Sequence, residues 1–260
     1  MLHALYTAAL GMLPQLTRLE LTAQNLANVS TAGYRREALF QRALIQAQQN
    51  LAHTPGDAET ADVPVVSYTD FRPGALQKTG NPLDVALDGP GFFVVQDALG
   101  ELFLTRQGRF VLRADGTLTT LDGKLVLGQG GSPLQVPLVA GTTQPPGTSQ
   151  AVASVLEITP EGQIRSGSAV VGTLWIAHAP VETLRRVDGV CFALAAGTTL
   201  TSLVPTQYRV VQGFLEGANV NPVEELVQLI ELQRQFEMGQ RVIRANDSTL
   251  DRSIEIARFV

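Results

Sequence analysis

The chain is poor in the residues on which most catalytic and metal-binding sites depend. Its 260 residues include one cysteine and three histidines, and only 6% are aromatic. Cys191 has no partner for an internal disulfide, and no two of His3, His53 and His178 have the spacing of metal ligands on one element. The sequence also has no G-x-S-x-G elbow, no glycine-rich loop followed by Lys-Ser or Lys-Thr, and no H-E-x-x-H motif. We therefore expect no enzyme activity, no cofactor and no metal.

Long apolar runs and a strong positive charge are missing as well. The longest apolar stretch, residues 169–177, is far shorter than the ~18 apolar residues that cross a bilayer. The net charge of −5 gives no electrostatic reason to expect binding to nucleic acid or to an anionic membrane. The N-terminus lacks a basic region, a long apolar block and a cleavage site, so we expect no cleavable secretory signal. Neither nucleic-acid binding nor direct membrane insertion is predicted.

What the chain does have is an apolar repeat of seven residues at both ends. Near the N-terminus the repeat is formed by Leu5, Met12, Leu19 and Leu26, and Leu16 lies on the same stripe. Apolar residues with this period form the seam of a helix that winds against other helices. Pro14 deletes one helical hydrogen bond, which predicts either a kink or the start of a second helical segment.

The C-terminal repeat is formed by Leu229, Phe236, Ile243 and Leu250, and Leu226 begins the neighbouring lane. Asn221 suits the N-cap of this helix, and Pro222 suits its first position. The neighbouring lane is polar through its middle, which favours a helix packed among several neighbours. The alternative is two ordinary amphipathic helices on one globular core. Two such seams on one chain favour the coiled pair.

Between the two repeats the sequence has the texture of a β-protein. Short runs rich in β-branched and aromatic residues are separated by glycines. Asp115-Gly116 and Asp122-Gly123 are hairpin signals, because glycine tolerates the positive φ that such turns require. The predicted fold class is mixed α and β. Long N- and C-terminal helices form a coiled-coil hairpin, and a central all-β domain holds antiparallel strands.

Three segments resemble the family of bacterial flagellar rod and hook proteins. They are NLANVSTAGYRR at residues 25–36, TGNPLDVALDGPGFFVV at 79–95, and QGFLEGANVNPVEELVQLIELQRQFEMGQRVI at 212–243. Residues 41–75 and 130–205 carry no motif of this kind. The matching positions are Asn25, Leu26, Ala27, Asn28, Thr31, Gly33, Tyr34, Asn81, Pro82, Leu83, Asp84, Gly91, Phe92, Phe93, Gly213, Leu215, Glu216, Asn219 and Val220.

The resemblance implies a non-enzymatic structural subunit of the flagellar basal-body rod, which crosses the periplasm. Such subunits leave the cell through the flagellar type III export apparatus without a cleavable signal. They polymerise helically through their terminal helices and transmit torque, in contact with copies of themselves and with other rod, hook and basal-body proteins. Residues 1–36 and 220–260 would then form an inner-tube coiled-coil domain, 37–78 a connecting segment, and 79–219 a central β-rich outer domain.

Within the family the chain is most similar to the proximal-rod subunit, because the stretch before Asn81 is short and because of the segment QFEMGQRVI. A distal-rod or hook-type axial subunit is the alternative. Two other classes remain open. A β-rich carbohydrate-binding or hydrolytic domain would need clustered aromatics or paired carboxylates on the sheet. A subunit of a related secretion needle or sheath would not need the NPLDVALDG segment.

Overall fold

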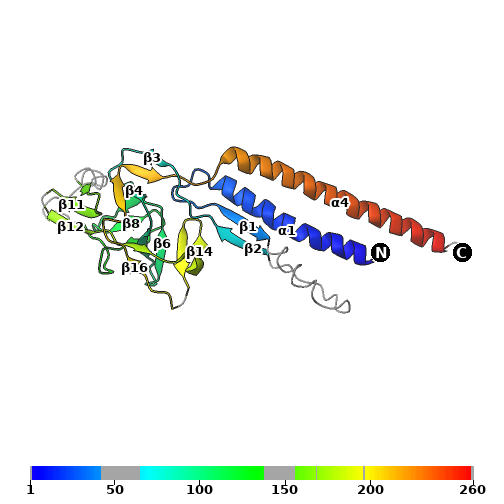
Figure 1. The fold of residues 1–260 in the computed structure, drawn as a ribbon, viewed down its shortest axis with the longest axis horizontal. Helices are drawn as coiled ribbons and strands as arrows, with labels where there is room; N and C mark the ends of the chain where they lie inside the picture. Colours follow the sequence, from blue (N-terminus) through cyan, green and yellow to red (C-terminus); the bar gives the residue numbers. More distant parts are fainter. Residues whose placement is uncertain (1, 42–64, 138–155, 168, 196, 259–260) are drawn as a thin grey trace. The chain divides into compact units, whose positions relative to one another are not determined.

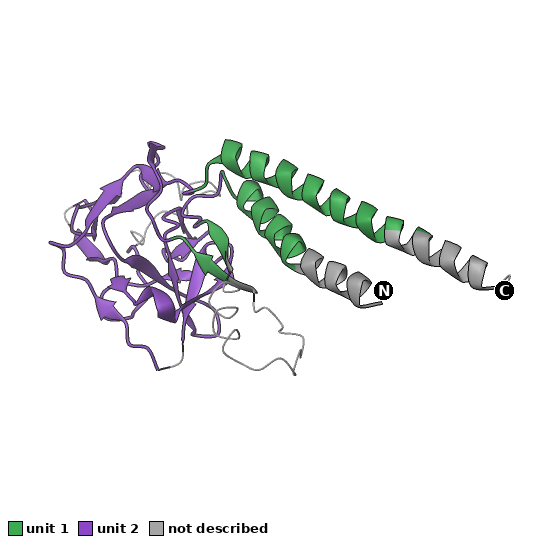
Figure 2. Ribbon diagram, turned by 45° about the vertical axis from the view of Figure 1, so that its right-hand side comes forward, with its two compact units in different colours: residues 1–29, 36–70, 220–260 green, residues 30–35, 71–219 purple. Residues whose placement is uncertain are grey.

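The protein separates into two compact units, shown in different colours in Figure 2. Unit 1 consists of residues 1–29, 36–70 and 220–260, and unit 2 of residues 30–35 and 71–219. The structure, a computed structural model, describes residues 2–41, 65–137, 156–167, 169–195 and 197–258. The short segment 30–35 belongs to unit 2, although the residues on both sides of it belong to unit 1.

Unit 1 is built from two long helices and a two-stranded ribbon. Helix α1 spans Leu2–Ala27, and helix α4 spans Pro222–Arg258. Strands β1 (Glu37–Gln41) and β2 (Val65–Thr69) pair antiparallel. Helix α1 contacts both α4 and β1, and the two helices run side by side in opposite directions (Figure 1).

The ends of the helices follow from local sequence. Helix α4 begins at Pro222, and the side-chain oxygen of Asn221 accepts a hydrogen bond of 3.1 Å from the backbone N–H of Val223. This bond satisfies one of the N–H groups that a helix start leaves open, so the predicted N-cap is confirmed. Helix α1 continues through Pro14 as a single helix, which excludes the predicted alternative of a second helical segment.

The predicted coiled-coil hairpin was wrong. Along the sequence, the described strands lie between the two helices. In space, α1 contacts strand β1 as well as α4. Knobs of a coiled coil are enclosed by four residues of the facing helix. On α4, Leu229, Phe236 and Ile243 are only partly buried, and Leu226 is 48% exposed. A heptad repeat identifies an apolar stripe, but it does not show that one intramolecular helix encloses it.

Unit 2 is mostly β, and all pairings among its described strands are antiparallel. Its largest sheet has nine strands, in the order β14-β15-β6-β5-β9-β8-β7, with β13 beside β5 and β16 beside β13. A short 3-10 helix, η1 (Val181–Thr183), precedes β14. The strands are β5 (Phe92–Gln96), β6 (Leu102–Thr105), β7 (Phe110–Leu112), β8 (Leu118–Thr120), β9 (Leu125–Val126), β13 (Ile176–His178), β14 (Leu184–Asp188), β15 (Cys191–Leu194) and β16 (Thr201–Ser202).

The predicted hairpin turns are present in this sheet. Gly116 has φ of +82° between the paired strands β7 and β8, and Gly123 has φ of +83° between β8 and β9. The Asp115 carboxylate accepts a hydrogen bond of 3.0 Å from the N–H of Thr117, which closes the first turn. Local turn chemistry therefore sets this part of the strand order.

Three smaller sheets complete unit 2. Strands β10 (Leu156–Ile158), β11 (Gln163–Ser166) and β12 (Ala169–Thr173) form one of them. The other two pair early strands with late ones, namely β4 (Val85–Asp88) with β17 (Arg209–Gln212), and β3 (Leu76–Lys78) with β18 (Phe214–Glu216). These long-range pairs bring the central and C-terminal parts of the chain together.

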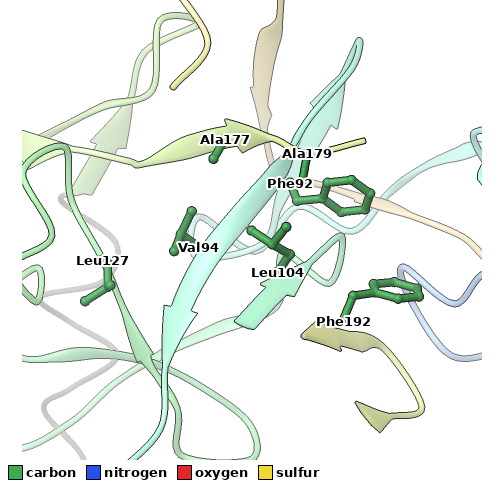
Figure 3. Packing of buried hydrophobic residues seen from close by; sticks show 7 residues of the cluster. All are labelled: Phe92, Val94, Leu104, Leu127, Ala177, Ala179 and Phe192. Carbon is green, nitrogen blue, oxygen red and sulfur yellow. The ribbon is translucent and has the colours of Figure 1, made fainter. Parts of the chain in front are cut away.

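The core of unit 2 lies around strands β5 and β6. Val94 and Leu104 are fully buried there and pack with Leu127, Ala177 and Phe192 (Figure 3). Ring centroids of Phe92 and Phe192 are 6.0 Å apart, a distance at which aromatic pairs attract beyond their burial. Unit 2 thus has its own apolar core.

Candidate functional site

A buried carboxylate, Glu216 at the end of β18, is bound by two arginines in unit 2. Its Oε1 accepts a hydrogen bond of 2.6 Å from Nη2 of Arg35 and one of 2.9 Å from the backbone N–H of Gly74. Its Oε2 accepts from Nη1 of Arg106 at 3.2 Å. The side chains of Arg35 and Glu216 are each only 1% exposed. Charges this deeply buried are tolerated only when they are paired and hydrogen-bonded.

The two guanidinium groups carry more positive charge than Glu216 neutralises. Arg106 also donates from Nη1 to the carbonyl oxygen of Leu87 at 3.1 Å and from Nη2 to that of Gly89 at 2.7 Å. Burial lowers the pKa of Arg106 below its ordinary value, and the charge of Arg35 adds to this effect while Glu216 opposes it. Arginine stays protonated in spite of such shifts. Arg106 therefore keeps its positive charge in the cluster.

The backbone of residues 30–35 is held at the same place. The N–H of Gly33 donates to the carbonyl of Glu216 at 2.7 Å, and the N–H of Asn219 donates to the carbonyl of Tyr34 at 3.3 Å. Gly33 has φ of +73°, and a Cβ at this position would lie 2.5 Å from the nitrogen of Gln107. Only glycine satisfies both the conformation and the close approach. This explains the glycine in the N-terminal motif.

Arg186 extends the cluster from a part of the sequence in which no motif is recognised. Its guanidinium lies over the ring of Tyr34 at 4.9 Å and over that of Phe192 at 5.2 Å. It also donates to the carbonyl of Arg35 at 2.5 Å and to that of Gly189 at 2.6 Å. Sequence reasoning missed Arg35, Arg106 and Arg186 as site residues, because nothing local marks an arginine as buried.

The residues of the NPLD segment form a second polar turn in unit 2. The side-chain oxygen of Asn81 accepts from the N–H of Leu83 at 3.3 Å, and its amide donates to Asp84 at 3.1 Å. The N–H of Gly213 donates to the carbonyl of Asp84 at 2.8 Å. The structure thus brings Asn81, Leu83, Asp84 and Gly213 together, while the neighbouring Pro82 contributes its carbonyl as an acceptor for Gln212.

Most of the other motif residues of unit 2 pack in its apolar core. Phe92, Phe93 and Leu215 are buried, and Gly91 lies where a Cβ would be 2.5 Å from a methyl group of Leu203. Thr31 is partly buried. Packing explains Phe92, Phe93, Leu215 and Gly91.

In unit 1, the side chain of Asn25 binds the backbone at the start of β1. Its amide donates to the carbonyl of Glu37 at 2.7 Å, and its oxygen accepts from the N–H of Glu37 at 2.9 Å. Asn25 is 1% exposed. Beside it, Arg36 forms an ion pair with the buried carboxylate of Glu225 on α4. Its Nη2 also donates to the side-chain oxygen of Gln228 at 3.4 Å. These bonds hold α1, β1 and α4 together.

The predicted assembly seam is only partly described. Leu16, Leu19 and Leu26 on α1 are partly buried, as are Leu229, Phe236 and Ile243 on α4, whereas Leu226 is exposed. The side chains of Leu5, Met12 and Leu250 lie outside the described part of the chain. The remaining motif residues of unit 1 are Ala27, which is exposed, Asn28, which is partly buried, and Val220, which is 8% exposed.

The described residues offer little for catalysis. Among them, no three His, Cys, Asp or Glu side chains are grouped so that they could hold a metal ion. Burial raises the pKa of the Cys191 thiol above its ordinary value, and Lys124 offsets this only in part. A protonated, buried thiol is a poor nucleophile. No described helix combines the length and the apolar composition needed to span a bilayer.

Comparison with known proteins supplies full-length relatives. The chain is 34% identical over 260 residues to the flagellar basal-body rod protein FlgF of Salmonella typhimurium, covering 98% of each chain. It is 33% identical over 268 residues to the rod protein FlgG of Agrobacterium fabrum, with 95% of this chain and 96% of that one covered. FlgF of Escherichia coli is 34% identical, with 98% of both chains covered.

The chain belongs to the flagellar basal-body rod protein family. Three family profiles match this rod protein: "Flagella basal body rod protein" at residues 5–35, "Flagellar hook protein FlgE/F/G D1 domain" at 86–166, and "Flagellar basal body rod FlgEFG protein C-terminal" at 211–256. Arg35, Arg106 and Glu216 each fall in a different one of these segments. In this rod protein, the buried ionic cluster therefore joins all three.

Proposed function

We propose that the protein is a structural, non-enzymatic subunit of the bacterial flagellar rod, located at the basal body. It polymerises helically through its terminal helices and transmits torque. The observation that carries this proposal is the surface of α4, where Val223 is 68% exposed, Val227 49% and Ile230 42%. An apolar helix face of this kind marks an interaction surface in a soluble unit. Membership of a rod family indicates that the partners are basal-body components.

The domain roles form part of the same proposal. The terminal segments 1–36 and 220–260 form the inner tube, residues 37–78 form a connecting segment, and residues 79–219 form the outer layer. The buried Arg35–Glu216–Arg106 cluster and the Phe-rich core support unit 2 as a body that keeps its shape under load, because breaking buried ion pairs is costly. The same proposal includes passage through the flagellar export apparatus.

We place the chain in the proximal rod, with a distal-rod or hook-type position as the alternative. Alignments with FlgG of Agrobacterium fabrum and of Bacillus subtilis extend over 268 and 274 positions, more than the 260 residues of this chain. Those FlgG proteins therefore contain residues that this chain lacks. The alignments with FlgF of Salmonella typhimurium and of Escherichia coli span 260 and 259 positions, no more than the length of this chain. This difference in length supports assignment to the FlgF type.

The test is complementation in a strain that lacks this gene. The wild-type chain carrying a small epitope tag should restore swimming and be present in isolated basal bodies. Phe236→Asp should abolish both, because a carboxylate replaces a partly buried aromatic on α4. Arg241→Ala is the matched control on the same helix, since Arg241 is 78% exposed. Absence of the wild-type chain from basal bodies would overturn the proposal, and so would normal swimming with Phe236→Asp.

A further inference from the structure

Residues 33–35 form a short buried segment of unit 2, which we call the strap. Gly33, Tyr34 and Arg35 are all buried, and Tyr34 and Arg35 are 0% and 1% exposed. The strap belongs to none of the described strands, and the chain before residue 30 and after residue 35 belongs to unit 1. A buried segment that joins no sheet depends on a few specific contacts, so it can open locally while the sheet stays formed.

Two backbone hydrogen bonds and one guanidinium connect the strap to its seat. The N–H of Gly33 donates to the carbonyl of Glu216 at 2.7 Å, and the N–H of Asn219 donates to the carbonyl of Tyr34 at 3.3 Å. Arg35 donates from Nη2 to Oε1 of Glu216 at 2.6 Å. The seat therefore includes the same carboxylate that binds Arg106.

Glu216 keeps a counter-charge when the strap leaves. Its Oε2 accepts from Nη1 of Arg106 at 3.2 Å, and its Oε1 also accepts from the N–H of Gly74 at 2.9 Å. Burial lowers the pKa of Arg106 most, and the charge of Arg35 lowers it further, so the two cations repel each other. Departure of Arg35 therefore leaves a balanced Arg106–Glu216 pair, rather than a buried charge without a partner.

The aromatic part of the seat also keeps contacts of its own without the strap. Arg186 lies over the ring of Phe192 at 5.2 Å and donates to the carbonyl of Gly189 at 2.6 Å. The ring centroids of Phe192 and Phe71 are 5.2 Å apart. Among the described residues, the apolar cluster around Val94 takes no member from the strap. The core of unit 2 can therefore stay packed while the strap is out of its seat.

We propose that the strap is a release device, which leaves its seat as a separate step while Glu216 stays paired with Arg106 and the sheet of unit 2 stays folded. The strap lies between α1 and β1 in the sequence. Its release therefore detaches this stretch of chain from unit 2 without the loss of unit 2 itself. The inference goes beyond the proposed function and does not depend on it.

Hydrogen exchange of the purified full chain tests the separate step. The N–H groups of Gly33 and Asn219 report on the strap. Those of Val94 and Leu127, which each form a backbone hydrogen bond of 3.1 Å and are fully buried, report on the core. In dilute urea the strap amides should exchange faster than the core amides and with little dependence on urea, because a local opening exposes little surface. Equal rates and equal urea dependence at both sites would overturn the proposal.

A substitution in the core separates local from global opening. Ile176 is 1% exposed, and Ile176→Val removes one buried methylene. Exchange at Val94 and Leu127 should become about two- to tenfold faster. The rate at Gly33 should not change, because release of the strap does not require the core to unfold. Acceleration at Gly33 by the same factor would show that the strap opens only together with the sheet, and the proposal would be wrong.

Arg106→Gln tests the charge balance, with an effect of opposite sign. In this variant the strap carries the guanidinium that neutralises Glu216, so opening leaves a buried carboxylate without a counter-charge. Exchange at Gly33 should slow by about tenfold or more, whereas a change that merely loosened the packing would speed it. Arg109→Gln, the same change at an exposed position, is the control and should have no effect.

The core amides of each sample show whether the variant is folded. Faster exchange at Gly33 in folded Arg106→Gln would contradict release with the Arg106–Glu216 pair intact. If Arg106→Gln does not fold, the wild-type chain and Ile176→Val decide the proposal, since both keep the ionic cluster complete.

Discussion

Units 1 and 2 differ in how far they bury their charged and apolar side chains. Unit 2 encloses Glu216 with Arg35 and Arg106 and surrounds Val94 and Leu104 with other apolar groups. Unit 1 leaves valine and isoleucine side chains on α4 in water, and its buried Asn25 and Glu225 form their contacts where α1, β1 and α4 begin or end. A fold stabilised from within and a helix pair with open apolar surface serve different ends. Under the proposed function, the first keeps its shape and the second provides the surface for assembly.

The largest expected effect comes from breaking the ionic cluster of unit 2. Glu216→Gln removes the negative charge and leaves Arg35 and Arg106 buried without a counter-charge, which costs about 3–5 kcal/mol of stability. Chemical denaturation of the purified chain should show this loss in the unfolding of unit 2. Glu157→Gln, at an exposed strand position, is the control and should change little. A loss below about 1 kcal/mol for Glu216→Gln would mean that the cluster does not stabilise unit 2.

Gly33→Ala should have the next largest effect, also in unit 2. The new methyl group would lie 2.5 Å from the backbone of Gln107, and the residue would be held at positive φ. The conformational penalty alone is about 1–2 kcal/mol, and the clash adds to it. Gly80→Ala separates the two causes, because Gly80 has φ of +76° with nothing within 4 Å. Thermal unfolding of both variants measures the difference, and equal losses would show that the close approach does not matter.

Asn25→Ala should act on unit 1 alone. It removes two hydrogen bonds to the backbone of Glu37 and leaves buried groups unpaired, for a cost of about 1–3 kcal/mol. Amide hydrogen exchange should accelerate at Glu37 and along β1, while strands of unit 2 keep their protection. Gln24→Ala, exposed on the same helix, serves as the control. Equal acceleration in unit 2 would mean that the two units do not unfold independently.

The smallest expected effect belongs to the exposed surface of α4. Arg241 and Glu237 form an ion pair at 3.8 Å with both side chains more than 60% exposed. Arg241→Ala should therefore change helix stability by no more than about 0.5 kcal/mol, as measured by the temperature dependence of circular dichroism at several salt concentrations. A loss above about 1 kcal/mol would show that solvent-exposed side chains of α4 contribute to stability as much as buried ones in unit 2 do.

Sequence reasoning succeeded where the cause is local. Asn221 and Pro222 mark the start of α4 because an N-cap needs only its own next residues. The Asp-Gly pairs mark two turns for the same reason. The coiled-coil hairpin failed because a stripe on one helix does not reveal what covers it, and α1 turned out to contact β1 as well as α4. A groove lined by Arg18 of α1, Leu39 of β1 and Leu232 of α4 could not be predicted, since it depends on three elements meeting.

The sequence by itself determined where helix α4 starts, where two of the hairpins turn, and that three segments match one family. It also determined which residue types were available for burial. Only the tertiary structure decided that Arg35 meets Glu216, which lies 181 residues further along the chain, and that Arg106 and Arg186 join them. A charged side chain becomes a buried ionic contact only when distant strands exclude water from it and supply its partners. Short-range preferences carry no information about that exclusion, because it arises from packing among residues far apart in the sequence.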